Sequence, residues 1–495
     1  MYKSINHKTP LTEGHSVSGS NIITDHKQCF VNENNSVNET KAFLSEPVKP
    51  VNENIPLTEN TIALSTACYF INGKALPDDD VTTLVNLNKK YAHVTVGGKH
   101  KVVSTKPYPV DGKSLHLESL SEFKSYFLHK PKIIGLNVGE AWLSWQGKVF
   151  KPDGISFFPK PDLCPSSIYN LFEGFPLTAK KGDVTPFVHH INEVICNNDL
   201  VAAEFVLGFL AHMIQKPNEK PSVAIVMKSV EGTGKGTMFE PLKKILGAYA
   251  VQVNGAYQLT GRFNSVVANK LLVFADEVDL TDVRTADKLK GLISEPRLSL
   301  ERKGIDPIQV PNLCRFIFAS NHETVIKAGN RERRYLVLEP SSKYAQNTAY
   351  FNQLWQWIKK DGACYLYDYL LNVDLTNFDP RKAPVTKALL EEKLANLTPC
   401  QEFLMNELNK ERPFDGVCRI ETQSMTIKCQ QWLEANNYNE SLPKTRSAIG
   451  KLLSRMGIAS IGRSGRDAFY ELPEIAIFRE NFSRLLGHTA DVIFD

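Results

Sequence analysis

The sequence predicts an α/β fold built around a phosphate-binding loop. An apolar, β-prone segment at 222–227 leads into a glycine-rich stretch at 229–237, and a helical segment follows at 238–246. A second apolar strand ends in two carboxylates, at 270–277, and a third ends in an amide, at 315–321. Strand, glycine loop and helix in this order form the setting in which backbone N–H groups bind phosphate.

The glycine loop reads SVEGTGKGT from Ser229 to Thr237. Glycines let backbone N–H groups turn toward phosphate oxygens, and Lys235 adds a positive charge near the β- and γ-phosphates. A simple turn between a strand and a helix is the alternative interpretation. The candidate nucleotide-binding residues are Gly232, Thr233, Gly234, Lys235, Gly236 and Thr237.

The loop departs from the usual G-x-x-x-x-G-K-[ST] pattern at two positions. Ser229 occupies the place of the first glycine, and Gly236 occupies the place of the hydroxyl that binds Mg²⁺. Thr237, one position later, is the candidate for that hydroxyl. Pro241 is expected to remove a helical hydrogen bond and to kink the following segment.

The second strand supplies the candidate catalytic carboxylates. Asp276 would hold Mg²⁺ directly or through water, and Glu277 would orient and deprotonate the attacking water. Asn321, at the end of the third strand, would contact the attacking water or the γ-phosphate. A strand that merely runs into an acidic turn is the alternative, but the upstream glycine loop favours nucleotide hydrolysis.

Basic residues follow the acidic strand in two places. A β-hairpin is predicted around a tip that contains Arg302 and Lys303. Farther along, Arg333 and Arg334 precede another strand, and a guanidinium there would reach the γ-phosphate bound by a neighbouring subunit. The alternative for the hairpin is a solvated surface loop.

Composition limits the class of protein. The chain has 495 residues and a formal net charge of +4, which permits nucleic acid as a partner without requiring it. Nine scattered cysteines with no C-x-x-C pair suit reduced thiols and argue against a zinc ribbon. No apolar run is long enough to span a bilayer, so no membrane partner and a cytoplasmic location are expected.

Five regions are predicted along the chain: a disordered polar tail (1–60), a small α+β domain (61–180), a nucleotide-binding domain with a helical collar (181–345), a helical connector (346–398) and a C-terminal domain (399–495). In the second region Asp78, Asp79 and Asp80 are interpreted as a helix N-cap and first turn rather than a metal site. His189 and His190, in the third region, are interpreted as structural rather than as metal ligands.

The C-terminal domain resembles a winged helix. Helices are expected near 400–408, 426–436 and 444–456, followed by a hairpin formed by 458–461 and 468–472. An ordinary solvated basic face is the alternative to DNA contact. The basic residues expected on one DNA-facing surface are Lys444, Arg446, Lys451, Arg455, Arg463 and Arg466.

The order of these motifs resembles a superfamily-3 helicase, a compact ring-forming AAA+ class. More closely, the chain is similar to the helicase part of phage and prophage primase-helicases related to the poxvirus type. The resemblance covers residues 91–340 and rests on the segments Leu259–Asn264, Ala275–Glu277, Leu289–Lys290, Ile293–Glu295, Glu301–Gly304 and Ala319–Asn321.

The resemblance implies an ATP- and Mg²⁺-dependent DNA helicase that assembles as a hexamer. Lys303 would grip a DNA phosphate in a central channel, with Arg302 nearby, and Arg333 or Arg334 would be the arginine finger. A separate primase or polymerase is a further expected partner, because the N-terminal segment is too short for a fused one and lacks its acidic motif. Two other functions stay open, an ATP-switched origin-binding initiator and a small-molecule kinase.

Overall fold

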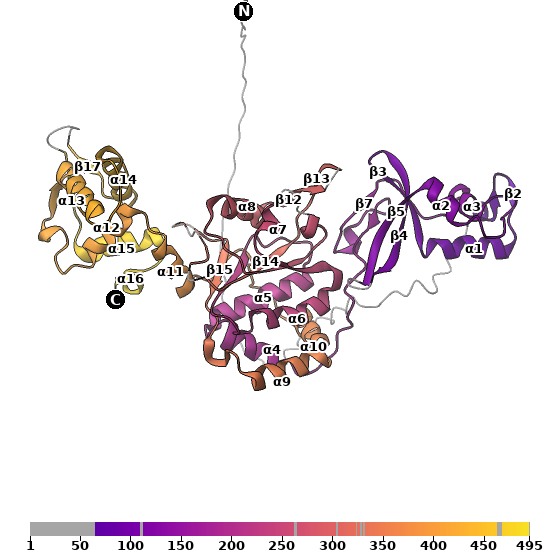
Figure 1. Ribbon diagram of the computed structural model, residues 1–495, viewed down its shortest axis with the longest axis horizontal. Helices are drawn as coiled ribbons and strands as arrows, with labels where there is room; N and C mark the ends of the chain where they lie inside the picture. The colour runs from indigo at the N-terminus through magenta and orange to yellow at the C-terminus, as the bar shows by residue number, and fades with distance from the viewer. Residues whose placement is uncertain are drawn as a thin grey trace, which may run out of the picture. The chain divides into compact units, whose positions relative to one another are not determined.

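We describe the fold from a computed structural model (Figure 1). It describes residues 65–108, 112–261, 265–302, 305–322, 324–326, 329, 332–462 and 468–494. The predicted polar tail, residues 1–60, lies outside this range, and so do Lys303, Arg463 and Arg466.

A five-stranded parallel sheet forms the central part of the chain. Its strand order is β10-β11-β14-β9-β15, and every neighbouring pair is parallel. The residues of these strands are mostly buried, as expected for a sheet covered on both faces. The bounds are β9 (Ala224–Lys228), β10 (Ala250–Asn254), β11 (Leu272–Asp276), β14 (Arg315–Ser320) and β15 (Tyr335–Leu338).

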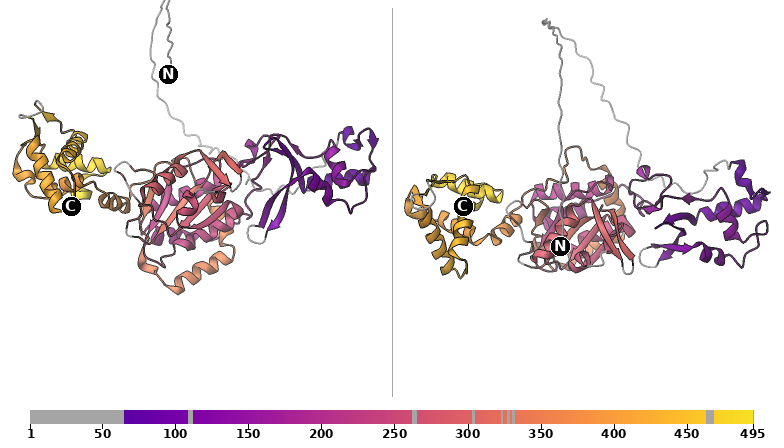
Figure 2. Two further views of the ribbon diagram at one scale, coloured as in Figure 1. Left: turned by 45° about the horizontal axis from the view of Figure 1, so that its top comes forward. Right: turned by 90° about the horizontal axis from the view of Figure 1, so that it is seen from above.

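Helices cover both faces of this sheet (Figures 1 and 2). Alternate residues of β9 point to opposite faces, so Ile225 and Met227 belong to one hydrophobic cluster and Val226 to the other. The first cluster includes residues of α5 (Leu200–Gln215), α6 (Lys235–Leu246) and α10 (Gly362–Asn372). The second includes residues of α8 (Val283–Ser294) and α11 (Lys387–Ala395).

The segment predicted as a connector is therefore partly built into the sheet's own core. Leu366 and Leu370 of α10 are fully buried in the first cluster. The elements that complete this part of the chain are α4 (Thr185–His189), a π-helical segment (His190–Ile195), α7 (Tyr257–Thr260) and α9 (Thr348–Lys359). The predicted basic hairpin is present as an antiparallel pair, β12 (Arg297–Arg302) and β13 (Ile305–Pro311).

The N-terminal described part is a mixed α/β unit, as predicted. Its four-stranded sheet has the order β5-β4-β3-β6, formed by β3 (Tyr91–Val96), β4 (Lys99–Tyr108), β5 (Gly112–Ser119) and β6 (Phe150–Lys151). Its helices are α1 (Asp78–Asn88), α2 (Leu120–Tyr126) and α3 (Val138–Ser144). Two short strand pairs complete it: β1 (Phe70–Ile71) with β2 (Lys74–Ala75), and β7 (Ile155–Ser156) with β8 (Tyr169–Asn170).

The acidic triplet of this part forms the first turn of α1, as the sequence indicated. The prediction that these residues also cap the helix is wrong, because the N-cap is Pro77, which has no side-chain hydrogen bond to offer. Trp142 and Trp145 are fully buried, and their indole N–H groups donate to Asn88 Oδ1 (2.9 Å) and to the Cys68 carbonyl (2.6 Å). These aromatics are core residues here.

The C-terminal part has its own hydrophobic core. A three-stranded antiparallel sheet of order β16-β18-β17 accompanies the helices. The first three helices and the hairpin agree with the predicted ranges within a few residues. The elements are α12 (Pro399–Leu408), β16 (Arg419–Glu421), α13 (Thr422–Ala435), α14 (Leu442–Arg455), β17 (Ser460–Ile461), β18 (Phe469–Glu471), α15 (Ile475–Leu486) and α16 (Ala490–Phe494).

Across the described ranges, every helix is too short or too polar to cross a lipid bilayer.

Candidate nucleotide-binding site

The glycine loop joins β9 to α6 at the carboxyl edge of the parallel sheet. Gly234 is the N-cap of α6 and has a φ of 92°, in the left-handed region that favours glycine. A Cβ atom at this position would lie 2.7 Å from His190 Cε1 and 2.7 Å from Phe351 Cε1. Gly234 is therefore required both for its backbone conformation and for the space it leaves.

The Lys235 ammonium lies inside the loop and is only 8% exposed. Its Nζ donates to the Ser229 carbonyl (2.8 Å) and to Asn321 Oδ1 (2.8 Å). Burial lowers the pKa of Lys235, while the carboxylates of Asp276 and Glu231 act in the opposite direction. The structure thus brings together three residues that the sequence assigned to nucleotide chemistry: Lys235, Asn321 and Asp276.

Ser229, the residue in place of the first glycine, forms hydrogen bonds inside the loop. Its Oγ accepts a hydrogen bond from Lys235 Nζ at 3.0 Å and lies 2.7 Å from the Thr233 hydroxyl. Thr233 is fully buried. Its hydroxyl is therefore engaged with the loop itself, and a nucleotide contact of Thr233 would come from its backbone N–H.

The acidic pair ends β11, as the sequence predicted. Asp276 Oδ1 accepts the backbone N–H of Glu277 at 3.1 Å. Glu277 is exposed and has a φ of 53°, which turns the chain out of the strand immediately after Asp276. In the described part of the chain, no group of three or more His, Cys, Asp or Glu side chains is arranged to hold a metal ion.

This donor set suits Mg²⁺, which proteins often bind through one or two carboxylates together with substrate phosphates and water. Asp276 supplies a carboxylate, and Thr237, in the first turn of α6, is the candidate hydroxyl. At Gly236, the position where that hydroxyl is expected, a Cβ atom would meet nothing within 4 Å. Steric crowding therefore does not explain the glycine at position 236.

Asn321 reaches the loop because β14 lies between β9 and β11. Ser320 pairs with Lys228, the last residue of β9, so the two strands end level with each other. The Ser229 N–H donates to the Ser320 carbonyl at 3.2 Å. Asn321 thus directly follows the last residue of β14 and lies next to the glycine loop.

Arg333 and Arg334 lie at the opposite ends of the strands, the amino ends. Tyr335, the first residue of β15, pairs with Ala224, the first residue of β9. Because the strands are parallel, the two arginines and the glycine loop are separated by the length of a strand, about 16 Å. Within one chain the structure does not bring them to the Lys235 ammonium.

The two arginines differ in their surroundings. The Arg334 Nε donates to Ser294 Oγ at 2.8 Å, and its Nη1 lies 3.6 Å from Glu332 Oε1. Arg333 is exposed. Arg334 is therefore held in place, whereas Arg333 projects from the surface.

His190 is a part of the site whose role the sequence did not reveal. It lies in the π-helical segment, is fully buried, and its two ring nitrogens lie 3.2 Å from the Gly234 carbonyl and 2.9 Å from the Tyr350 hydroxyl. Burial lowers the pKa of His190 to about 4. Gln346 adds a backbone hydrogen bond to the Gly232 carbonyl at 3.3 Å. These contacts join segments far apart in the sequence, so no local pattern could have identified them.

The predicted DNA-binding residues are placed only in part. Arg302 ends β12, but its side chain, Lys303, Arg463 and Arg466 lie outside what the structure describes. Lys444 and Arg446 are both on α14, but two positions apart, which places them about 200° from each other around the helix. The expectation of one shared surface is therefore wrong for Arg446.

The parallel sheet, with its glycine loop and its polar residues at one edge, defines an α/β protein with a candidate phosphate site. Residues 227–334 match the sequence model of a family of unknown function (DUF5906). This range begins near the end of β9 and ends just before β15.

A relative with a curated description is the DNA primase-polymerase of Nitratiruptor phage NrS-1. It is 23% identical over 247 residues, which make up 49% of this chain and 33% of the phage protein. The match thus spans about a third of the relative's length.

Solved structures of the C-terminal region of NrS-1 share the fold. One apo structure has a TM-score of 0.59 at 16% sequence identity and covers 80% of this chain and 99% of that one. A second apo form has a TM-score of 0.60 at 17% identity and covers 78% and 98%. At this level of identity the likeness concerns the fold.

Proposed function

We propose that the chain is an ATP-dependent DNA helicase that serves the replication of a phage, a prophage or another mobile element. It would act as a ring of identical subunits, a hexamer of the superfamily-3 AAA+ type, and would move on single-stranded DNA. The observation that carries the proposal is the 2.8 Å hydrogen bond between Lys235 Nζ and Asn321 Oδ1, formed next to Asp276.

This contact supports ATP hydrolysis because it joins the start of α6 to the end of β14 at the carboxyl ends of the strands, where Asp276 also ends β11. Lys235 would balance the phosphate charge, Asn321 would orient the attacking water, and Glu277 would accept its proton. Asp276 and Thr237 would hold Mg²⁺, which supplies charge neutralisation of the phosphates when bound. Glu277 is exposed and can therefore be reached by solvent water.

The position of Arg333 and Arg334 supports action between subunits. The backbone of both arginines lies about 16 Å, the length of a strand, from the glycine loop of the same chain, so the structure does not bring a guanidinium to that loop. The same guanidinium can reach the loop of a neighbour when subunits pack head to tail, the kind of interface that closes into a ring.

The relative supports the biological setting. Similarity to a phage DNA primase-polymerase favours a role in phage DNA replication. The likeness of fold to the C-terminal region of NrS-1 covers nearly all of that solved region. The helicase, ATPase and ring assignments rest on the residues of this chain.

ATP turnover with and without single-stranded DNA tests the proposal. The wild type should hydrolyse ATP faster when DNA is present, and Lys235→Ala should lose about 100-fold or more in turnover, since a charge that stabilises the transition state is removed. Lys243→Ala is the matched control, because Lys243 is an exposed lysine on the same helix. Turnover that DNA leaves unchanged would favour the small-molecule kinase instead.

A second candidate, the ATP-switched initiator, differs in one measurable step. The β12–β13 hairpin with its basic tip favours translocation over switching alone. A forked-DNA strand-displacement assay with the wild type and Lys303→Ala separates the two functions. Strand displacement by the wild type and its loss in the variant supports the helicase, whereas ATP hydrolysis without displacement supports the initiator.

A further inference from the structure

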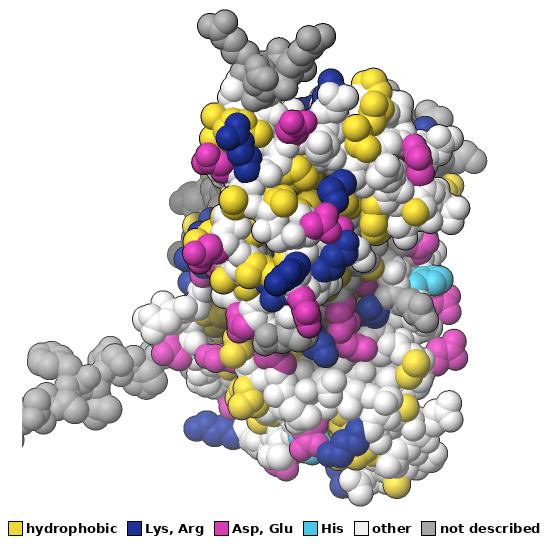
Figure 3. Space-filling view, turned by 90° about the vertical axis from the view of Figure 1, so that its left-hand side faces the viewer, with side chains coloured by type: hydrophobic (Ala, Val, Ile, Leu, Met, Phe, Trp, Pro, Cys, Tyr) yellow, Lys and Arg dark blue, Asp and Glu magenta, His cyan; other side chains and the backbone are white. Residues whose placement is uncertain are grey.

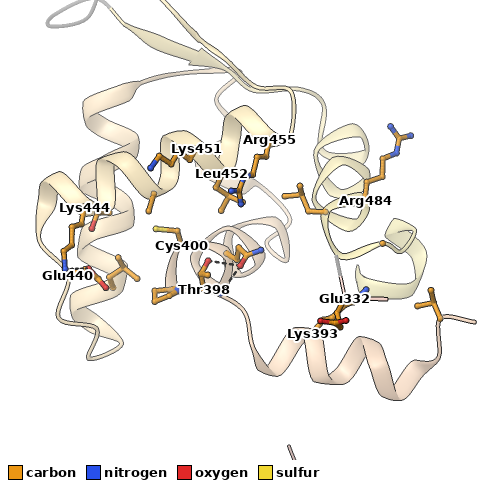
Figure 4. A pocket seen from close by; sticks show the side chains of 18 residues that line it. Glu332, Lys393, Thr398, Cys400, Glu440, Lys444, Lys451, Leu452, Arg455 and Arg484 are labelled. Atoms are coloured by element: carbon orange, nitrogen blue, oxygen red, sulfur yellow. Dashed lines mark hydrogen bonds and ion pairs between the residues drawn. The ribbon is translucent and has the colours of Figure 1, made fainter. Parts of the chain in front are cut away.

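A cavity of about 990 Å³ opens beside α14 in the C-terminal part of the chain (Figure 4). Residues of α11, α12, α13, α14 and α15 contribute to its lining. It does not include any residue of the glycine loop. Its volume lies at the upper end of the range typical of ligand pockets, about 300–1,000 Å³.

The cavity collects positive charge. Five basic and two acidic side chains line it. On the face of the molecule drawn in Figure 3, by contrast, basic, acidic and apolar side chains are interspersed. The five basic residues are Lys393, Lys444, Lys451, Arg455 and Arg484.

Three of these cations share one side of α14. Lys444, Lys451 and Arg455 are seven and four positions apart, so they fall within about 40° of one another and span about 16 Å along the helix. Lys451 and Arg455 are exposed, and neither forms an ion pair with another described residue. Lys444 pairs with Glu440 at 3.8 Å, an exposed contact of little energetic value.

The remaining charges are engaged. Lys393 Nζ donates to the Leu486 carbonyl at 2.6 Å, and Arg484 Nε bonds Glu480 Oε1 at 3.0 Å. The second lining carboxylate, Glu332, accepts the backbone N–H groups of Arg333 and Arg334. The charge available to a ligand therefore comes mainly from Lys451 and Arg455.

The lining is apolar below these cations. Leu433, Leu452 and Leu485 line the cavity together with Cys400, which is 6% exposed. A phosphate alone would not use such a surface. A nucleotide would, because its base is largely apolar on its faces whereas its phosphate is anionic.

We propose that this cavity binds a short stretch of single-stranded DNA, with phosphates at Lys451 and Arg455 and a base against Leu452 and Leu485. A duplex does not fit, because a cavity of about 990 Å³ has the size of a small-ligand pocket. The site goes beyond the helicase proposal, because it is separate from ATP hydrolysis and assigns a single-stranded ligand to the C-terminal part.

Protection of thiols tests the site directly in the full-length chain. Oligo-dT of six nucleotides, without ATP, should slow the alkylation of Cys400 several-fold, as followed by peptide mass spectrometry. Cys418 is the internal control, because it is exposed and does not line the cavity. The Cys429 thiol donates to Cys400 at 3.8 Å and lowers the pKa of Cys400, which favours its reaction with the reagent.

Matched variants connect the protection to the cations. Lys451→Gln with Arg455→Gln should weaken oligo-dT binding and flatten its salt dependence by about 1.4 in log–log slope, the loss of two phosphate contacts to a single strand. Arg446→Gln, which removes a charge from another side of the same helix, should leave that slope unchanged. Lys235→Ala should retain the protection of Cys400, so the failure of ATP hydrolysis and the failure of this site are separable.

Three outcomes would overturn the proposal. One is equal labelling of Cys400 with and without oligo-dT. Another is protection by a blunt duplex as strong as that by the single strand. The third is protection by dTMP or ATP at concentrations where the strand gives none, which would make the cavity a mononucleotide pocket.

Discussion

The glycine loop carries Gly236 at the position where the usual phosphate-loop pattern has a hydroxyl. Gly236 faces open space, whereas Thr237 lies one position farther along α6. The loop sequence revealed this departure, but it could not show that Ser229 and Thr233 brace the loop from within. That information depends on side-chain rotamers, which the spacing of residues does not determine.

We expect Thr237→Ala to raise the Mg²⁺ concentration needed for half-maximal ATP turnover by about tenfold. This factor corresponds to a loss of roughly 1.4 kcal/mol in Mg²⁺-binding free energy when one ligand is removed. Adding Gly236→Ser should restore part of this loss, because the new side chain has room. Turnover measured against Mg²⁺ concentration is the assay. Unchanged Mg²⁺ dependence in Thr237→Ala would show that another group supplies the ligand.

The buried His190 makes stability depend on pH. Burial lowers its folded-state pKa to about 4, below the ordinary value near 6.5. Above pH 6.5 both states are neutral; below it the unfolded state takes up a proton that the folded state does not. The free energy of unfolding should therefore fall between pH 6.5 and 4, by at most about 1.4 kcal/mol per pH unit from this residue.

Urea unfolding at pH 7 and pH 5 measures this dependence. His93 and His212, whose pKa values are also lowered to about 4 by burial, should add to the fall in the same direction. His190→Asn should reduce the fall, and His129→Gln, a change at an exposed histidine, should not. An identical pH dependence in His190→Asn would contradict the assignment.

At the scale of elements, the sequence predicted most of what is local. The strands that end in Asp276 and Asn321 follow from apolar runs that stop at polar residues, and the helices near 400–456 follow from periodicity. Register and strand order depend on contacts far apart in the sequence, so β14 could not be assigned its exact place beside β9 and β11 in advance. The role of α10 in the central core was missed for the same reason.

Helix α11 holds the segment after Asn321 through one buried carboxylate. Glu392, 1% exposed, accepts the backbone N–H groups of Val325 (3.1 Å) and Ile326 (3.1 Å), and lies 3.4 Å from Lys228 Nζ. Glu392→Ala should lower the free energy of unfolding by about 3 kcal/mol or more, because it leaves these donors and the lysine without their partner.

Chemical denaturation measures this loss, and the adjacent Glu391→Ala is its control. Glu391 is partly exposed and pairs with Lys387 at 4.0 Å, so its removal should change stability by about 0.5 kcal/mol or less. Equal effects of the two substitutions would argue against the role of Glu392.

At the scale of the whole molecule, the candidate site residues that the sequence singled out lie in two groups. Lys235, Asp276 and Asn321 gather at one edge of the sheet, while Arg333 and Arg334 lie at the other. The sequence analysis expected a guanidinium of Arg333 or Arg334 to act on a nucleotide bound by a neighbouring subunit. The parallel direction of β9 and β15, which keeps the two groups apart within one chain, is compatible with that expectation.

Mixing two inactive variants tests whether the two halves meet between chains. Lys235→Ala and Arg333→Ala should each hydrolyse ATP poorly, and an equal mixture should recover about a quarter of wild-type turnover if subunits mix at random in head-to-tail contacts. The double variant, which carries both substitutions on one chain, should show no recovered ATP turnover when it is assayed alone at the same total concentration. No recovery in the mixture would count against a shared site.

The separation of the arginines from the glycine loop has a consequence for any measurement on dilute protein. If the arginines act on a nucleotide bound by a neighbouring chain, as proposed, a chain without neighbours lacks one of the groups needed for ATP hydrolysis. Specific turnover should then decline steeply as the protein is diluted below the concentration at which neighbours associate, even though every molecule remains folded. The concentration of the protein in the cell would then control its rate of ATP hydrolysis per molecule.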